Sequence, residues 1–202
     1  MIKFNLKDNL CVVDIGTNKI ITVNYKKSQN GQLKIVNINH KKSEGISRSI
    51  ISSESKFFKT IDNAVLKDNH LSGSNIISSI SDTQLSIKKN FEEIKMRGFK
   101  ISKRDIRKIF IENFKKSSTQ KMTILHSFPK TFFIDGKSIS KNPVGLECEK
   151  LGLGFTNLYV RDDYIKLVES AYLQSKKKKK IDFIDSGLAS AMSSLTHSEK
   201  LN

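Results

Sequence analysis

The stretch Leu10–Ile20, with the sequence LCVVDIGTNKI, constrains the fold of this chain more than any other. Four apolar residues lead into Asp14, which indicates a short buried strand that ends in a carboxylate. Gly16 permits a tight turn, and a second strand is expected to begin at Lys19. A carboxylate at the end of a buried strand is costly unless a partner pairs with it. The stretch therefore predicts a strand, a polar turn and a second strand.

The turn suits a phosphate cradle with a metal beside it. Gly16 lets the backbone approach a ligand closely, and the next three residues offer backbone N–H groups, a hydroxyl and one positive charge. A carboxylate at this position would hold a metal such as Mg²⁺ through water. The candidate binding residues are thus Asp14, Gly16, Thr17, Asn18 and Lys19. The alternative is an ordinary hairpin whose turn contains Gly and Asn.

The first part of the chain predicts a meander, a helix and a further strand. Asn30-Gly31 is a strong hairpin signal between the apolar-rich segments 20–25 and 33–38. Ser52 or Ser53 is expected to cap a helix with one apolar face, followed by a connection ending at Gly73-Ser74 and a strand over 75–80. The residues of that face are Phe57, Phe58, Ile61, Ala64 and Val65.

Residues 81–160 predict a subdomain of their own, with one helix against a small sheet. Its expected strands are 91–96, 123–128, 131–135 and a last one ending near Val160, and Gly136 closes the third. Ser102 and Asp105 resemble a capping box at the start of the helix. The apolar stripe of that helix is Ile106, Ile109, Phe110 and Phe114. We interpret Phe110, Phe132 and Phe133 as core residues rather than stacking platforms for bases.

The last part returns to the first subdomain. A helix is expected to begin at Asp162-Asp163 and to bury Ile165, Val168, Ala171 and Tyr172. The run Lys176–Lys180, interpreted as a solvated loop, then leads to a strand over 181–184. After Gly187 we expect a short packing helix carrying Leu188, Met192 and Leu195.

Composition bounds the function classes. The 202 residues carry a net charge of +16, 37% hydrophobic residues and no Trp. Such a charge is compatible with binding of nucleic acid, but a Lys-, Asn- and Ile-rich composition also follows from an AT-rich coding sequence with Lys on solvated surfaces. Cys11 and Cys148 form no C-x-x-C pair, which favours a reducing compartment. No run approaches the roughly 18 apolar residues of a membrane span.

Three segments resemble the bacterial cell-division protein family FtsA, of the actin and Hsp70 superfamily. Asp14-Ile15-Gly16-Thr17-Asn18-Lys19 is similar to its first phosphate loop, with Asn18 in place of a Thr. Leu125-His126 with Pro129, then Phe133-Ile134-Asp135-Gly136 and Asn142-Pro143-Val144-Gly145-Leu146, resemble a segment that actin and Hsp70 lack. Leu188-Ala189-Ser190-Ala191 is the third match, where Ser186-Gly187 replaces the family's Glu-Pro.

The resemblance implies an α/β (α+β) fold. Residues 1–80 and 161–202 would form an incomplete actin-like subdomain of the ribonuclease-H type, and 81–160 the inserted strand–helix–strand subdomain. By resemblance, the complete protein binds ATP, and this chain is its N-terminal half, either a fragment or a truncated product. Asp14 would then hold Mg²⁺ through water, Gly16 and Thr17 would contact phosphates through their backbone, Asn18 would add a hydrogen bond, and Lys19 would offset phosphate charge.

The resemblance also implies partners. They are FtsZ and other divisome proteins at the inner face of the cell membrane at midcell, with self-association through the inserted subdomain. Membrane contact in that family uses a C-terminal helix that this sequence does not contain. We expect no specific binding of nucleic acid and no enzyme activity beyond weak ATP hydrolysis with a second nucleotide-binding half. His40, His70, His126 and His197 are scattered and show no metal-ligand spacing. The alternatives are another ATPase or a sugar kinase of the superfamily, or a basic nucleic-acid-binding module.

Overall fold

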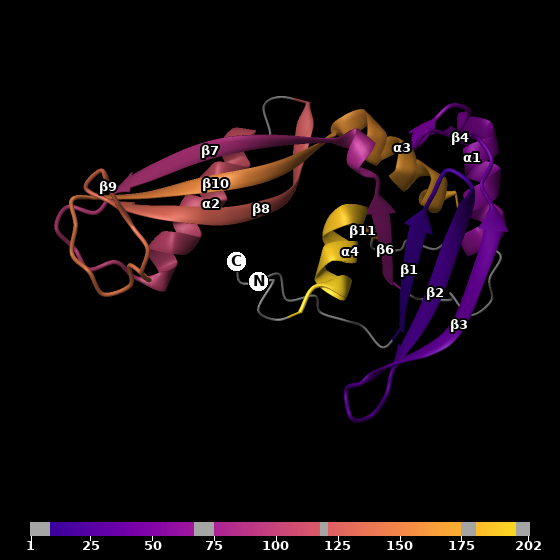
Figure 1. The fold of residues 1–202 in the computed structure, drawn as a ribbon, viewed down its shortest axis with the longest axis horizontal. Helices are drawn as coiled ribbons and strands as arrows, with labels where there is room; N and C mark the ends of the chain where they lie inside the picture. The colour runs from indigo at the N-terminus through magenta and orange to yellow at the C-terminus, as the bar shows by residue number, and fades with distance from the viewer. Residues whose placement is uncertain (1–8, 67–74, 118–120, 175–180, 197–202) are drawn as a thin grey trace. The chain divides into compact units, whose positions relative to one another are not determined.

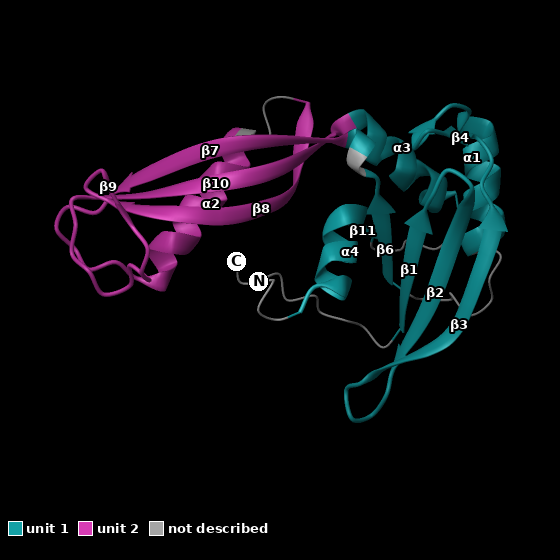
Figure 2. Ribbon diagram, viewed as in Figure 1, with its two compact units in different colours: residues 1–84, 163–202 teal, residues 85–162 magenta. Residues whose placement is uncertain are grey.

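The chain divides into two units, which Figures 1 and 2 show in a computed structural model. The structure describes residues 9–66, 75–117, 121–174 and 181–196. Unit 1 takes in residues 1–84 and 163–202, and unit 2 takes in residues 85–162. The expectations for Gly73-Ser74, Lys176–Lys180, His70 and His197 lie outside the described residues.

Unit 1 begins with the expected meander. Strands β1 (Asn9–Ile15), β2 (Lys19–Lys27) and β3 (Leu33–Lys42) pair in antiparallel order. The second hairpin closes at Asn30-Gly31, where Gly31 has a φ of +82° and its N–H donates to the Ser28 carbonyl over 2.9 Å. The hairpin signal in the sequence is thus confirmed.

Two parallel strands complete this sheet. Strand β6 (Asn75–Ile80) pairs parallel to β1, and β11 (Ile181–Asp185) pairs parallel to β6. The order is β11-β6-β1-β2-β3. A three-stranded meander with two further strands added in parallel beside its first strand is the ribonuclease-H-like arrangement of actin-like domains. The predicted α+β actin-like fold is confirmed.

One face of the sheet is covered by helices. Helix α1 (Glu54–Ile61) continues into a π-helical turn, η1 (Asp62–Leu66), and α3 (Asp162–Leu173) joins it. The predicted apolar residues of both helices pack into or against the core, except Ile165, which is only partly buried and is not part of it. Ser53 caps α1 without a side-chain hydrogen bond. The buried core consists of Cys11, Val13, Ile20, Phe57, Ile61, Ala64, Val65, Ile76, Val168, Ala171 and Tyr172. Burial raises the pKa of Tyr172, whose hydroxyl lies 2.9 Å from Ser78 Oγ.

The last helix differs from its expectation. Helix α4 (Ser186–Ser194) begins at Asp185, whose carboxylate accepts hydrogen bonds from the N–H groups of Gly187 and Leu188. None of the residues of α4 is buried, and Met192 and Leu195 are 55% and 39% exposed. The prediction that these two side chains pack was wrong.

Unit 2 is a four-stranded antiparallel sheet with one helix. Strands β7 (Leu85–Lys95), β8 (Met122–Ile134), β9 (Lys137–Ile139) and β10 (Lys150–Arg161) lie in the order β7-β10-β8-β9. A 3₁₀ turn, η3 (Asp82–Gln84), leads into β7. Helix α2 (Lys103–Ser117) lies beside β7 and β8. The buried core is formed by Met96, Ile101, Ile109, Cys148, Leu151, Leu153 and Phe155.

The strand boundaries in unit 2 differ from those predicted from the sequence. The two strands expected around Pro129 are one continuous strand, β8, and the segment 91–96 belongs largely to the longer β7. The register of β8 against β10 shifts between Gly154 and Phe155, which pair with Thr131 and Pro129. Since proline has no N–H to donate, a strand tolerates it at such a bulge, and Pro129 therefore does not end β8.

Helix α2 begins with the expected capping box. The Ser102 hydroxyl and N–H donate to the Asp105 carboxylate, and the Asp105 N–H donates back to Ser102 Oγ. These bonds lower the pKa of Asp105. Ile106, Ile109 and Phe110 face the core, but Phe114 is 45% exposed and the prediction for it was wrong.

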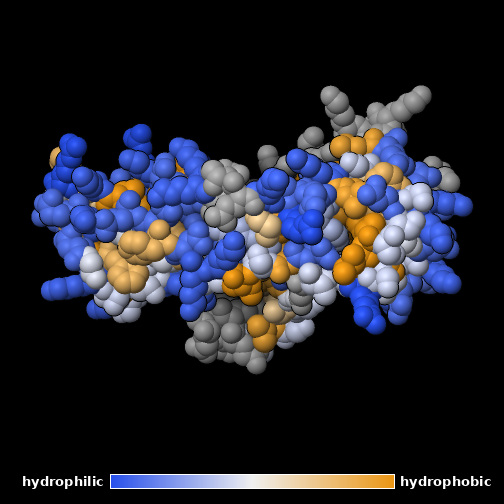
Figure 3. Space-filling model, turned by 90° about the horizontal axis from the view of Figure 1, so that it is seen from above, coloured by the Kyte–Doolittle hydropathy of each residue, from blue (hydrophilic) through white to orange (hydrophobic). Residues whose placement is uncertain are grey.

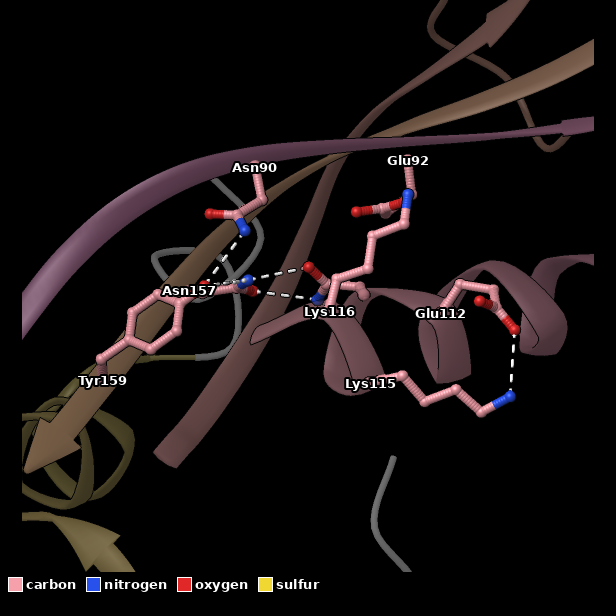
Figure 4. Close-up of polar contacts among 8 residues, drawn as sticks. Asn90, Glu92, Glu112, Lys115, Lys116, Asn157 and Tyr159 are labelled. Carbon is pink, nitrogen blue, oxygen red and sulfur yellow. Dashed lines mark hydrogen bonds and ion pairs between the residues drawn. The ribbon is translucent and has the colours of Figure 1, made fainter. Parts of the chain in front are cut away.

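The position that Phe114 was expected to fill belongs to a buried polar network instead (Figure 4). Asn113 and Asn157 are fully buried and exchange two amide hydrogen bonds, of 2.9 and 3.3 Å. Asn157 also accepts from Ser127 Oγ over 2.7 Å and donates to the Tyr159 hydroxyl over 3.2 Å. Polar side chains thus tie α2 to the sheet. Nearby, Lys116 at the end of α2 forms an ion pair with the buried Glu92.

The face of the unit 2 sheet away from α2 carries aromatic rings over a glycine. Phe91 and Phe133 meet edge to face, with ring centroids 5.3 Å apart. A Cβ on Gly152 would lie 2.6 Å from Cζ of Phe91, so the absence of a side chain there makes room for the ring. Phe132 packs on the core as predicted, whereas Phe133 lies half-buried on the opposite face, so its assignment to the core was wrong.

Candidate functional site

The predicted turn lies at the carboxyl end of the parallel strands of unit 1. Strands β1, β6 and β11 run in the same direction, so Ile15, Ile80 and Asp185 end at one edge of the sheet. Open α/β sheets bind their ligands outside the carboxyl ends of their parallel strands. The turn between β1 and β2 is therefore in the position expected of a binding loop (Figure 1).

Gly16 gives the turn its close geometry. Its N–H donates to the Lys19 carbonyl over 3.1 Å, and a Cβ at Gly16 would lie only 2.9 Å from that same oxygen. Any other residue would push the two strands apart, so glycine is required here. The Gly16 N–H is thus used inside the turn, whereas the N–H groups of Thr17 and Asn18 have no hydrogen-bond partner among the described residues.

Asp14 is held by the neighbouring parallel strand. Its Oδ1 accepts a hydrogen bond of 2.8 Å from Ser79 Oγ, which in turn accepts from the Ile15 N–H over 3.0 Å. Asp14 is exposed, so the cost of burying a carboxylate that its position suggested does not arise. Within the described part of the chain, Oδ2 has no hydrogen-bond partner and remains available to a ligand.

A second hairpin supports the turn. Strands β4 (Ile46–Ser47) and β5 (Ile50–Ile51) are joined by Arg48 and Ser49, both with positive φ, of 47° and 62°. The Ser49 N–H donates to Thr17 Oγ1 over 3.0 Å, and the Ser49 carbonyl accepts from Gln84 Nε2 over 3.3 Å. Because Thr17 Oγ1 accepts this bond, its hydroxyl proton stays available to donate to an anion.

The remaining predicted residues face solvent. Asn18 and Lys19 are exposed, and the Asn18 carbonyl accepts a 3.0 Å bond from the Ser43 N–H. The turn thus carries two N–H groups, a hydroxyl and an ammonium, and the Asp14 carboxylate lies at its start. That set of groups can bind phosphate oxygens and place one carboxylate near a hydrated cation.

Several supporting residues were missed by sequence reasoning. Ser79 and Ser49 are 65 and 32 positions away from the residues that they contact. The signal for Ser79 was its place near the end of the strand 75–80, which a parallel pairing with β1 puts beside Asp14. For Ser49 the sequence carries no comparable signal. Asp185 also lies at this edge, but it is buried and serves as the N-cap of α4.

No cluster of three or more His, Cys, Asp or Glu side chains suited to a metal occurs in the described ranges. The single carboxylate of Asp14 nevertheless fits Mg²⁺, which keeps most of its water ligands and takes one or two carboxylates plus phosphate oxygens. The arrangement therefore suits a cation that arrives with a nucleotide rather than one held by the protein alone.

Comparison with protein families identifies one segment. Residues 75–159 match the SHS2 domain inserted in FtsA. The segment spans β6 of unit 1, η3, helix α2 and the sheet of unit 2 except for Val160 and Arg161 at the end of β10. The chain is therefore FtsA-like over these residues, and the strand–helix–strand insert predicted from the sequence belongs to an actin-like fold. No curated protein sequence matches the chain.

One solved structure shares the fold of this chain. A PilM-PilN type IV pilus biogenesis complex superposes with a TM-score of 0.56 at 7% identity, over 91% of this chain and 49% of that one. At this identity the likeness concerns the fold alone. A Bacteroides thetaiotaomicron protein with actin-like ATPase fold and unknown function scores 0.36 at 13% identity, covering 96% of this chain and 58% of that one. The cytoplasmic domain of EpsL, an inner membrane component of the Vibrio cholerae type II secretion system, scores 0.35 at 8% identity, with coverages of 87% and 55%. The chain spans about half the length of these structures.

Proposed function

We propose that this chain forms the phosphate-binding side of an ATP site in an FtsA-like cell-division protein. The observation that carries the proposal is the β1–β2 turn, whose free N–H groups and Thr17 hydroxyl lie at the carboxyl edge of the parallel strands with Asp14 beside them. The SHS2 match to residues 75–159 supports the choice of FtsA among actin-like proteins.

The roles of the site residues follow from their groups. The N–H groups of Thr17 and Asn18 and the Thr17 hydroxyl would donate to phosphate oxygens, while Lys19 would offset their charge. Asp14 would orient Mg²⁺ through water, and Ser79 keeps Asp14 in place. The ion, when bound with the nucleotide, neutralises part of the phosphate charge. Nothing in this set encloses adenine or ribose, so a second half would supply that part of the site.

The resemblance to FtsA also suggests partners. We propose FtsZ and the divisome at midcell as its setting, with self-association through the SHS2 unit and a role in anchoring the FtsZ ring at the inner face of the membrane. No helix in the described ranges is both long and apolar enough to cross a bilayer. By the same resemblance to FtsA, we propose that the chain belongs to a nucleotide-dependent assembly protein rather than to an enzyme.

The nucleotide proposal is tested by titrating Mg·ATP into the isotopically labelled 202-residue chain. Exposed contacts to phosphates are screened by solvent, so the dissociation constant is expected to be no better than about 1 mM, or about −4 kcal/mol. The amide signals of residues 16–19 should shift, and Asp14→Asn should weaken the response. Asp182→Asn on β11 of the same sheet is the matched control and should leave it unchanged.

Two results would contradict this reading. Amide signals of residues 16–19 that stay fixed at millimolar Mg·ATP would remove the phosphate role of the turn. Micromolar affinity that is abolished by Asp14→Asn would show that these residues form a complete site, against the shared site proposed here.

A further inference from the structure

Two loops lie side by side at one end of unit 2. We call them the loop tip, which consists of residues 97–104 and 141–147. The Ile101 N–H donates to the Leu146 carbonyl, and the Gly145 N–H donates to the Ile101 carbonyl, each over 2.8 Å. Figure 1 shows these loops at the end of the sheet near β9. The second loop contains the Asn142–Leu146 motif, which the nucleotide proposal does not use.

The loop tip exposes apolar side chains that its backbone holds in place. Phe99 is 70% exposed, Leu146 47% and Val144 38%, whereas Ile101 between them is buried. Asn142 Oδ1 accepts a 3.1 Å bond from the Val144 N–H and fixes the second loop. Exposed apolar side chains gathered on fixed loops mark a contact surface more often than scattered ones do. The face of the chain drawn in Figure 3 is largely hydrophilic, with separate hydrophobic patches.

Basic side chains surround this apolar group. Five exposed cations belong to it: Arg97, Lys100, Lys103, Arg104 and Lys141. Four acids lie among or beside them. Glu147 lies 3.9 Å from Lys100 in a solvent-exposed pair, and Asp105 stands in the first turn of α2. Glu149 and Asp135 are joined by a hydrogen bond from the Glu149 N–H to the Asp135 carboxylate. Lys103 and Arg104 stand in the first turn of α2, where the helix dipole is positive and acids would be more stable. Residues 97–104 and 141–147 themselves contain these five cations and a single acid, Glu147, so the loop tip carries a net positive charge that favours an anionic surface.

We infer that the loop tip docks on the surface of an anionic lipid bilayer. Phe99, Val144 and Leu146 enter the boundary between headgroups and acyl chains, and the surrounding lysines and arginines contact headgroup phosphates. A protein partner would need a pocket to receive Phe99, whereas a bilayer accommodates side chains that project from loops. This contact is independent of the nucleotide site and of the C-terminal helix implied by the family.

The absence of Trp from the sequence makes a clean reporter available. Phe99→Trp places a single indole in the loop tip, and Ile38→Trp, at a side chain that is 61% exposed on β3, is the matched control. Both full-length variants are mixed with vesicles of phosphatidylcholine, with and without phosphatidylglycerol. The emission of Phe99→Trp should shift to the blue and be quenched by brominated lipid only when phosphatidylglycerol is present, while Ile38→Trp should not respond.

Vesicle flotation gives the second readout. Lys100→Gln with Lys103→Gln should lower the partition coefficient about 25-fold, roughly fivefold for each lost cation. Phe99→Ser with Leu146→Ser should lower it at least about tenfold. Ile35→Ser with Ile38→Ser should have no effect, and dispersed amide spectra confirm that each variant is folded.

Any of three results would overturn the inference. First, an equal response of the two Trp reporters would mean that the basic chain binds without using the loop tip. Second, a chain that does not float with anionic vesicles would leave an acidic protein as the partner to seek. Third, loop-tip variants that float as well as the unchanged chain would show that these residues are not needed.

Discussion

The hydrogen bonds of the buried pair Asn113 and Asn157 allow the loss of stability in their alanine variants to be predicted. Among the described residues, Asn113→Ala removes three hydrogen bonds, two with Asn157 and one of 3.1 Å to Ser127 Oγ. Asn157→Ala removes four, because Asn157 also bonds to Ser127 and Tyr159. At about 1 kcal/mol for each bond, the two variants should lose about 3 and about 4 kcal/mol of unfolding free energy.

The double variant separates the pair from its surroundings. Two of the bonds are shared between Asn113 and Asn157, so the double variant should lose about 5 kcal/mol rather than about 7. The coupling of about 2 kcal/mol is the signature of the reciprocal amide pair. Native-state hydrogen exchange of the β10 amides in the full chain measures it, because those amides report on the opening of unit 2.

Asn142→Ala is the matched control for these variants. Asn142 is exposed and makes one bond, of 3.1 Å from the Val144 N–H, so its loss should cost about 1 kcal/mol or less. If Asn113→Ala and Asn157→Ala instead act additively, or cost no more than Asn142→Ala does, the two amides do not form the pair described here.

Two further predictions concern unit 2. Gly152→Ala should destabilise it by about 1–3 kcal/mol, because the new Cβ would lie 2.6 Å from the Phe91 ring, whereas Gly154→Ala, with its nearest atoms at 3.7 Å, should cost clearly less in urea unfolding. An equal cost for both would contradict the close packing of Phe91. Ser102→Ala should cost about 1 kcal/mol at neutral pH. Because Ser102 lowers the pKa of Asp105, the folded state favours the ionised carboxylate. This stabilisation is complete when the pH is above the pKa that Asp105 has in the unfolded chain, and it is lost as the pH falls through the lower pKa of the folded state. The difference between Ser102→Ala and the unchanged chain should therefore shrink below both pKa values, to the part that the bond from the Asp105 N–H to Ser102 Oγ contributes. A difference that does not change with pH would argue against the role of the Asp105 carboxylate.

Much of the fold was predictable because its signals are local. The Asn30-Gly31 turn, the 3.6-residue periodicity around Phe57 and the Ser102–Asp105 box each specify structure within a few residues. The order of the strands did not follow from such signals. It came from the resemblance to FtsA, since β6 and β11 reach β1 only through long-range parallel pairing.

The errors have a common cause in tertiary contacts. Helical spacing put Phe114 on the buried face, but the chain places the amide of Asn113 there because Ser127 and Asn157 satisfy it. Pro129 suggested a strand end, yet a bulge in the partner register absorbs it. For the candidate site, the sequence named the residues of the turn but could not name Ser49, which arrives through a separate hairpin.

The way in which unit 2 enters and leaves the chain has a mechanical consequence. Its first and last strands, β7 and β10, are antiparallel neighbours, and Leu85 at the start of one pairs with Val160 at the end of the other. The two connections therefore lie about 5 Å apart. A load that pulls them away from each other would open the β7–β10 ladder one hydrogen bond at a time, like a zipper. A load along the strands that pulls both connections together would leave that ladder intact.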